Sequence, residues 1–159
     1  MEMFQKIVLI VLLLSFSNFA SANEAKDKSV SKSTSKKKTL SGKKLVVFVS
    51  SENLQQAGMG FGLVLSAVKQ GAEVTLVIGG NAVKYALKEG QQHTYFAKNK
   101  TPRMLLQSAL KSGVNIQLCS ANTEEMELDE DDFLDGVKLV ISTEIFAKVF
   151  EEDSKIISF

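Results

Sequence analysis

Four short runs of β-branched and aromatic residues recur in the second part of the chain, and a stretch with helical spacing follows each of them. The runs are Lys44–Ser50, Ala72–Ile78, Val114–Cys119 and Val137–Ser142, and Lys155–Phe159 resembles a last edge strand. Continuous apolar runs of this length are typical of strands buried on both faces of a parallel sheet. Strands that alternate with helices predict a three-layer α/β sandwich, flavodoxin-like in the broad sense, with a mostly parallel sheet of about five strands.

The segments between the runs carry the signals that begin and end helices. Gly71 and Gly113 stand where a helix normally ends, and Thr101-Pro102 provides a cap followed by a first-turn proline. We therefore expect helices over Leu54–Gln70, Asn81–Leu87, the stretch from Pro102 to Gly113, the acidic run Glu124–Asp135, and Thr143–Phe150.

Residues 1–22 have the features of a signal peptide. Lys6 gives a short positive region, Ile7–Leu14 is an unbroken apolar run, and Ala20-Ser21-Ala22 is a small-x-small cleavage pattern. The apolar run is shorter than the roughly 20 residues that a membrane-spanning helix needs. We expect cleavage after Ala22, an exported product and no stable membrane span afterwards, with a retained membrane anchor as the alternative.

Residues 23–43 predict a disordered basic tether, because they are mostly Ser, Lys and Thr, without an aromatic residue. Such a segment cannot bury enough apolar surface to offset the entropy lost on ordering. It holds seven lysines and two acidic residues, whereas residues 44–159 hold 11 basic and 15 acidic residues. The chain is thus a basic tail, which either contacts anions or is a solvated spacer, on a single acidic domain.

Cys119 is the only cysteine and closes the third predicted strand. Ligands of open α/β sheets bind outside the carboxyl ends of strands, and a lone thiol in an exported protein cannot form an internal disulfide. The thiol is therefore either a small buried packing group or a reactive group. A helix beginning after it would favour the thiolate, while Glu124 and Glu125 would disfavour it.

Small and polar residues follow each predicted strand, and the parallel arrangement brings these strand ends to one edge of the sheet. We expect them to line a pocket around Cys119. They are Ser51, Asn53, Gly79, Gly80, Asn81, Ser120 and Ser142.

Other functional motifs are weak or missing from the sequence. The segment Gly58-Met59-Gly60-Phe61-Gly62 lacks the spacing of a nucleotide-binding loop. One cysteine and one histidine, His93, do not supply the usual ligands of a zinc site, and the acidic run lacks the spacing of a calcium loop. No basic-aromatic patch for nucleic acid is seen. We expect no metal, no cofactor and no nucleic-acid partner.

Several of these features occur together in a known order. They are Gly71-x-Glu73-Val74, Gly79, Thr101-Pro102, Ser112-Gly113-Val114-x-Ile116-x-Leu118-Cys119, and Asp135-Gly136-Val137. This order, over residues 44–159, resembles the DsrE/DsrF-like family of small α/β sulfur-relay proteins.

The resemblance implies that Cys119 carries sulfur as a persulfide or senses thiol-reactive species. It also implies homo-oligomers, often trimers or hexamers, a small thiol or a protein as sulfur donor or acceptor, and a periplasmic location for an exported member. The competing interpretation is a catalytically silent oligomeric scaffold in which Cys119 only packs in the core. Whether the chain is an enzyme is left open by the sequence.

Overall fold

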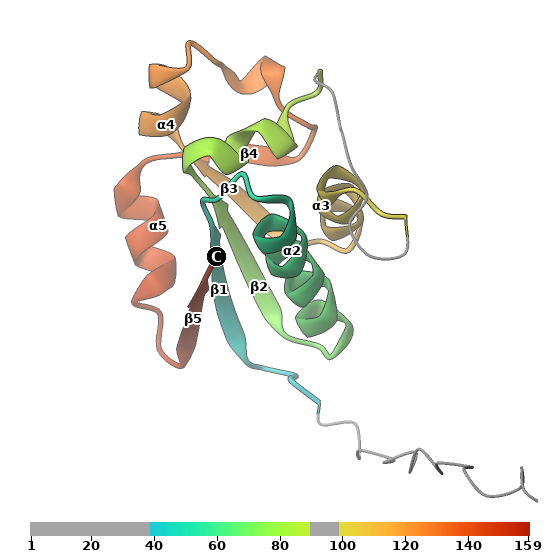
Figure 1. The fold of residues 1–159 in the computed structure, drawn as a ribbon. Coiled ribbons are helices and arrows are strands. Elements are labelled where there is room, and N and C mark those ends of the chain that lie inside the picture. Colours follow the sequence, from blue (N-terminus) through green and yellow to red (C-terminus); the bar gives the residue numbers. More distant parts are fainter. Residues whose placement is uncertain (1–38, 90–98) are drawn as a thin grey trace, which may run out of the picture. The chain divides into compact units, whose positions relative to one another are not determined.

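A five-stranded parallel sheet forms the centre of the domain. The computed structural model describes residues 39–89 and 99–159. The strands lie in the order β4-β3-β2-β1-β5 and every neighbouring pair is parallel (Figure 1). Their bounds are β1 Lys44–Val49, β2 Glu73–Ile78, β3 Asn115–Cys119, β4 Val137–Val140 and β5 Ser154–Ser158. The predicted α/β fold with a parallel sheet of about five strands is confirmed.

The predicted signal peptide and nearly all of the predicted tether lie outside the described residues, as does His93. Within the part of the chain that the structure describes, no helix has the length and apolar character needed to cross a membrane.

The helices divide unequally between the two faces of the sheet (Figure 1). From β1 to β4 the chain moves across the sheet in one direction, each strand lying beside the one before it. Because the crossovers between parallel strands are right-handed, α2 and α3 both lie on one face of the sheet. From β4 the chain returns to the far side of β1, and α5 consequently covers the opposite face. The helical segments are α2 Leu54–Lys69, the 3-10 helix η1 Gly80–Ala86, α3 Pro102–Lys111, α4 Ser120–Glu125, the 3-10 helix η2 Glu130–Asp132 and α5 Ser142–Val149.

The predicted signals begin and end the two longest helices. The Asn53 side chain accepts hydrogen bonds from the first backbone amides of α2, and Thr101 accepts one from the Met104 amide in α3. Gly71 and Gly113 follow the helix ends with φ of +91° and +77°. Glycine adopts this left-handed conformation without steric cost, which explains the abrupt stops.

The acidic run is not one helix, and that prediction was wrong. Helix α4 starts directly after Cys119, and the chain leaves the helical conformation at Glu127, whose φ is +55°. The carboxylates of Asp129 and Asp132 then accept hydrogen bonds from nearby backbone amides and form η2. Short acidic side chains that bind local amides compete with a continuous helix in this way.

Two smaller differences concern the segments after β2 and β4. Residues 80–86 form a 3-10 helix, and α5 begins at Ser142, where the fourth strand was expected to end. Differences of one or two residues at element ends are usual.

The larger hydrophobic core lies between the sheet and the α2–α3 layer. Its fully buried side chains include Phe61, Leu76, Leu106 and Leu118. The α5 face has only a small buried cluster, formed by Val46, Val77, Val140 and Ile145. This face is therefore thinly covered.

An ion network fixes the C-terminal end of α5 to the start of β1. Glu151 pairs with Lys148 in α5 and lies 3.2 Å from Lys44 Nζ in β1. The hydrogen bond from Lys148, followed by the one from Lys44, lowers the pKa of Glu151, and the same bond raises the pKa of Lys148. The Ser154 hydroxyl at the start of β5 donates to the Lys148 carbonyl. Both contacts hold α5 over the sheet.

Candidate functional site

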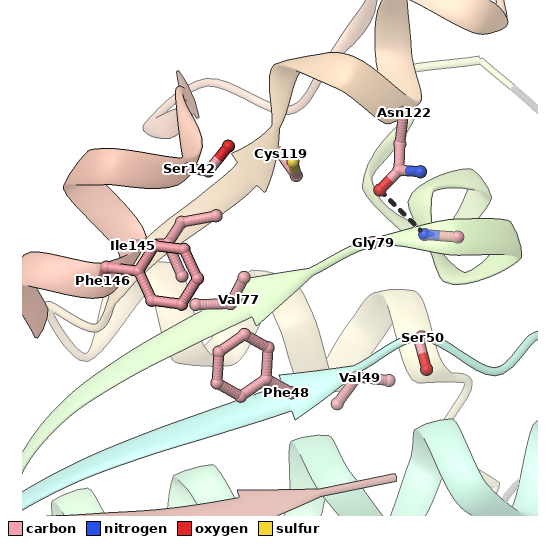
Figure 2. A pocket seen from close by; sticks show the side chains of 11 residues that line it. Phe48, Val49, Ser50, Val77, Gly79, Cys119, Asn122, Ser142, Ile145 and Phe146 are labelled. Atoms are coloured by element: carbon pink, nitrogen blue, oxygen red, sulfur yellow. Dashed lines mark hydrogen bonds between the residues drawn. The ribbon is translucent and has the colours of Figure 1, made fainter. Parts of the chain in front are cut away.

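A cavity of about 310 Å³ opens where the carboxyl ends of β1, β2 and β3 meet the first turns of α4 and α5 (Figure 2). The lining, drawn in Figure 2, is mainly apolar and comes from β1, β2, η1, β3, α4 and α5 and from the turns after β1 and β2. The lining residues are Phe48, Val49, Ser50, Val77, Gly79, Gly80, Cys119, Asn122, Ser142, Ile145 and Phe146.

Cys119 is half-buried and lines this cavity. It is the last residue of β3 and stands directly before α4. Figure 2 shows its sulfur between Ser142 and Asn122. The parallel register places it beside Val140 in β4, so the thiol lies at the edge of the sheet where the α5 layer begins.

Asn122 joins α4 to the loop that follows β2. Its Oδ1 accepts a hydrogen bond of 3.2 Å from the Gly80 amide (Figure 2). Gly80 has a φ of +48°, and a Cβ there would lie 2.9 Å from the Ser50 carbonyl oxygen. A Cβ on Gly79 would come to 3.0 Å from Asn122 Oδ1. Gly80 is thus required by its backbone conformation and its close approach to Ser50, whereas a side chain at Gly79 would force Asn122 to shift slightly.

The loop after β1 is held against η1 by a separate set of contacts. The Tyr85 hydroxyl donates to the Glu52 carbonyl oxygen at 2.6 Å, and Lys84 forms an ion pair with the Glu52 carboxylate. Burial raises the pKa of Tyr85, and the hydrogen bond to Glu52 raises that of Lys84. Tyr85 also meets Phe61 edge to face, with ring centroids 6.1 Å apart. These contacts fix the loops that form one side of the cavity.

The structure places only some of the expected pocket residues on the cavity. Four of them line it together: Cys119, Gly79, Gly80 and Ser142. Asn53 is instead the cap of α2, and its backbone amide donates a hydrogen bond of 3.1 Å to the Ser51 hydroxyl oxygen. Asn81 is exposed in η1, and Ser120 is half-buried in the first turn of α4. None of these last four residues is among the lining.

Sequence reasoning missed Asn122 and the apolar part of the wall. Asn122 lies three residues after Cys119, and a helix that starts directly after the strand turns such a residue back toward the sheet. That spacing was a usable signal. No such signal exists in the sequence for Phe48 and Val77. In a strand buried on both faces, the sequence does not show which helical layer a residue faces until the strand order is known.

The described residues contain neither a cluster of metal ligands nor a glycine-rich nucleotide-binding loop. They contain no group of three or more His, Cys, Asp or Glu side chains placed to hold a metal ion. The glycine-rich segment 58–62 is part of α2 and not a loop, and Gly60 packs against Val49 and Phe159.

Comparison with known proteins identifies one matching family model, that of the DsrE/DsrF-like family, over residues 43–159. Among solved structures, the ychN protein from E. coli is 16% identical, with a TM-score of 0.63 over 74% of this chain and 98% of its own. MTH1491 from Methanobacterium thermoautotrophicum, described as of unknown function, is 14% identical, with a TM-score of 0.60 over 74% and 99%. BT1422 from Bacteroides thetaiotaomicron is 16% identical, with a TM-score of 0.52 over 73% and 94%. These similarities show a shared fold. No curated protein matches the chain.

Proposed function

The chain belongs to the DsrE/DsrF-like family, and on that premise we propose that Cys119 carries sulfane sulfur as a persulfide. Family membership supports a role related to sulfur relay. One observation carries the finer proposal: the sole cysteine lines the cavity at the carboxyl ends of the strands, where ligands of open α/β sheets bind.

The proposed step is an exchange between a thiolate and a persulfide. The Cys119 thiolate attacks the outer sulfur of a donor R–S–SH, and a new S–S bond forms as the S–S bond of the donor breaks. The donor leaves as R–S⁻ with the electron pair and then takes a proton from water. Cys119 becomes Cys–S–SH, and the exchange involves no net oxidation or reduction.

The surroundings of Cys119 are suited to such an exchange. Ser142 places a hydroxyl in the same cavity, and hydroxyl donors stabilise thiolates by charge-assisted hydrogen bonds. Because the chain has no second cysteine, no internal disulfide can discharge the persulfide. The acceptor is therefore a small thiol or a cysteine of another protein.

Intact-protein mass spectrometry tests this proposal. The purified protein, treated with a small-molecule persulfide and then desalted, is expected to gain the mass of one sulfur atom, and a small thiol should remove it. Cys119→Ser is expected to gain nothing, while Ser120→Ala, a neighbour outside the cavity lining, should load like the unmodified protein.

Two results would contradict the persulfide proposal. One is an unmodified Cys119 under conditions that load a free small thiol. The other is a thiol that resists a small alkylating reagent until the protein is denatured, which would favour the scaffold in which Cys119 only packs.

We also propose that copies of the chain associate and that the protein is exported to the periplasm. Association is supported by large apolar side chains exposed on both layers: Met59, Leu63 and Met104 on one, and Ile141, Phe150 and Ile156 on the other. Residues 1–22 support export through their signal-peptide pattern.

Sedimentation velocity of residues 23–159 tests the association. We expect a species of three or more copies at micromolar concentration, because exposed apolar area of this kind is normally covered in a partner. A single species with the mass of one chain across the concentration range would contradict it.

A further inference from the structure

Among the residues that the structure describes, none with a charged side chain lines the Cys119 cavity. The apolar part of its wall is formed by Phe48, Val77, Ile145 and Phe146, from β1, β2 and α5. Figure 2 shows the two rings beside Val77, with Cys119 nearer the strand ends. In register, Phe48 pairs with Val77 and Val77 with Gln117, two residues before the thiol. The Gln117 side chain is buried and outside the lining, so a ligand that reaches Cys119 borders the hydrocarbon of Phe48 and Val77 on the side of the sheet.

The lining offers an anionic ligand few donors, chiefly the Ser142 hydroxyl and the Asn122 amide nitrogen, and the Cys119 thiolate of the proposed function competes for the first of them. The Gly80 amide, a donor at the strand ends, is already bound to Asn122 Oδ1. The N-terminus of α5 carries partial positive charge, but Glu144 in its first turn supplies an opposing carboxylate. Moving a charged group from water into such surroundings costs free energy that only a counter-charge or several hydrogen bonds would recover. The geometry favours an uncharged ligand.

We propose that the cavity selects sulfur donors whose carrier group is an uncharged hydrocarbon, in preference to inorganic or otherwise anionic donors. This inference rests on the proposed function of Cys119 and adds the chemical class of its donor. The hydrocarbon group lies against Phe48, Phe146 and Val77 and presents the outer sulfur to Cys119. An apolar wall also favours the neutral form R–S–SH over its anion, and the neutral form is the electrophile in the exchange described above.

Two sulfenylating reagents that differ in charge test this selectivity without requiring a persulfide. Benzyl methanethiosulfonate is neutral, and sulfonatoethyl methanethiosulfonate is an anion. With either, the Cys119 thiolate attacks the sulfenyl sulfur, a disulfide forms and methanesulfinate leaves. Since the chain has one cysteine, each rate belongs to Cys119. We expect the neutral-to-anionic rate ratio to be about tenfold or more above that of the urea-unfolded protein.

Variants of α5 locate the effect. Phe146→Lys places an ammonium group on the cavity wall and should lower the ratio about tenfold by attracting the anion. Phe146→Gln removes the ring without adding charge and should change the ratio less. Ala147→Lys adds the same charge at an exposed neighbouring position outside the lining, and should leave the ratio near that of the unmodified protein.

The outcomes separate this inference from the proposed function. Equal rate ratios in folded and unfolded protein, or equal effects of Phe146→Lys and Ala147→Lys, would overturn the inference even if Cys119 forms a persulfide. A raised ratio that only Phe146→Lys abolishes would support it. A failure to load sulfur would overturn the persulfide proposal and with it the assignment of a sulfur donor, whereas the reagent rates would still report the charge preference of the cavity.

Discussion

Replacing Phe61 with alanine is expected to lower the free energy of unfolding by about 3–5 kcal/mol, the range measured for large-to-small substitutions of buried aromatic residues. Phe61 lies in α2, is fully buried and is among the largest side chains in the core. Its ring contacts the edge of Tyr85, which in turn holds the loop after β1. Removing it both opens a void and weakens one side of the cavity.

Urea unfolding followed by circular dichroism measures the loss of stability caused by Phe61→Ala. Gln56→Ala is the matched control, since that side chain is exposed in the same helix and its removal leaves no internal void. We expect the control to change the free energy of unfolding by less than about 0.5 kcal/mol. A loss of unfolding free energy below about 1 kcal/mol for Phe61→Ala would contradict the close packing of its ring between α2 and the sheet.

Gly60→Ala is expected to destabilise the protein by about 1–3 kcal/mol, the usual cost of overpacking a core. Gly60 is buried in α2, where alanine would normally improve a helix. A Cβ there would lie 2.7 Å from Val49 Cγ2 and 3.1 Å from a ring carbon of Phe159. Val49 is fully buried and β-branched, so it cannot turn aside cheaply.

Gly62→Ala provides the control for that prediction, because it lies in the same helix and a Cβ there has nothing within 4 Å. It should stabilise the protein by about 0.5–1 kcal/mol through helix propensity alone. The double variant Gly60→Ala, Val49→Ala should lose less stability than the two single changes added together, since Val49→Ala removes the obstructing methyl. If Gly60→Ala and Gly62→Ala changed the free energy of unfolding in the same direction, close packing would not explain why residue 60 is glycine.

The strands and long helices were predictable because their signals are local. A continuous apolar run such as Lys44–Ser50 is typical of a strand buried on both faces. Thr101-Pro102 is a local signal for the start of a helix, because proline is favoured at the first helical position. The acidic run after Cys119 was not predictable from its spacing of apolar residues. Its conformation is decided by hydrogen bonds that the Asp129 and Asp132 carboxylates accept from backbone amides, which a periodicity argument ignores.

The candidate site was predictable in position but not in composition. Parallel strands bring their carboxyl ends together, so Cys119, Gly79 and Ser142 had to lie at one edge. The apolar wall depends on which face of the sheet α5 covers, and that depends on β5 lying beside β1 and not beyond β4. No residue in α5 or β5 signals this choice locally. Phe48 and Phe146 line the same cavity only because of it.

The place of β5 beside β1 also has a kinetic consequence. The Ser50 amide and hydroxyl bond to the Phe159 carbonyl across 109 residues, whereas β1, β2 and β3 each pair with the next strand along the chain. Contacts this distant in sequence pay the largest loop-closure entropy and tend to form late. We therefore expect β1 to β4 and the α2–α3 layer to assemble first, and α5 to be drawn over the opposite face when β5 docks. The thiol would thus remain open to solvent until the final stage of folding, when its apolar surroundings close around it.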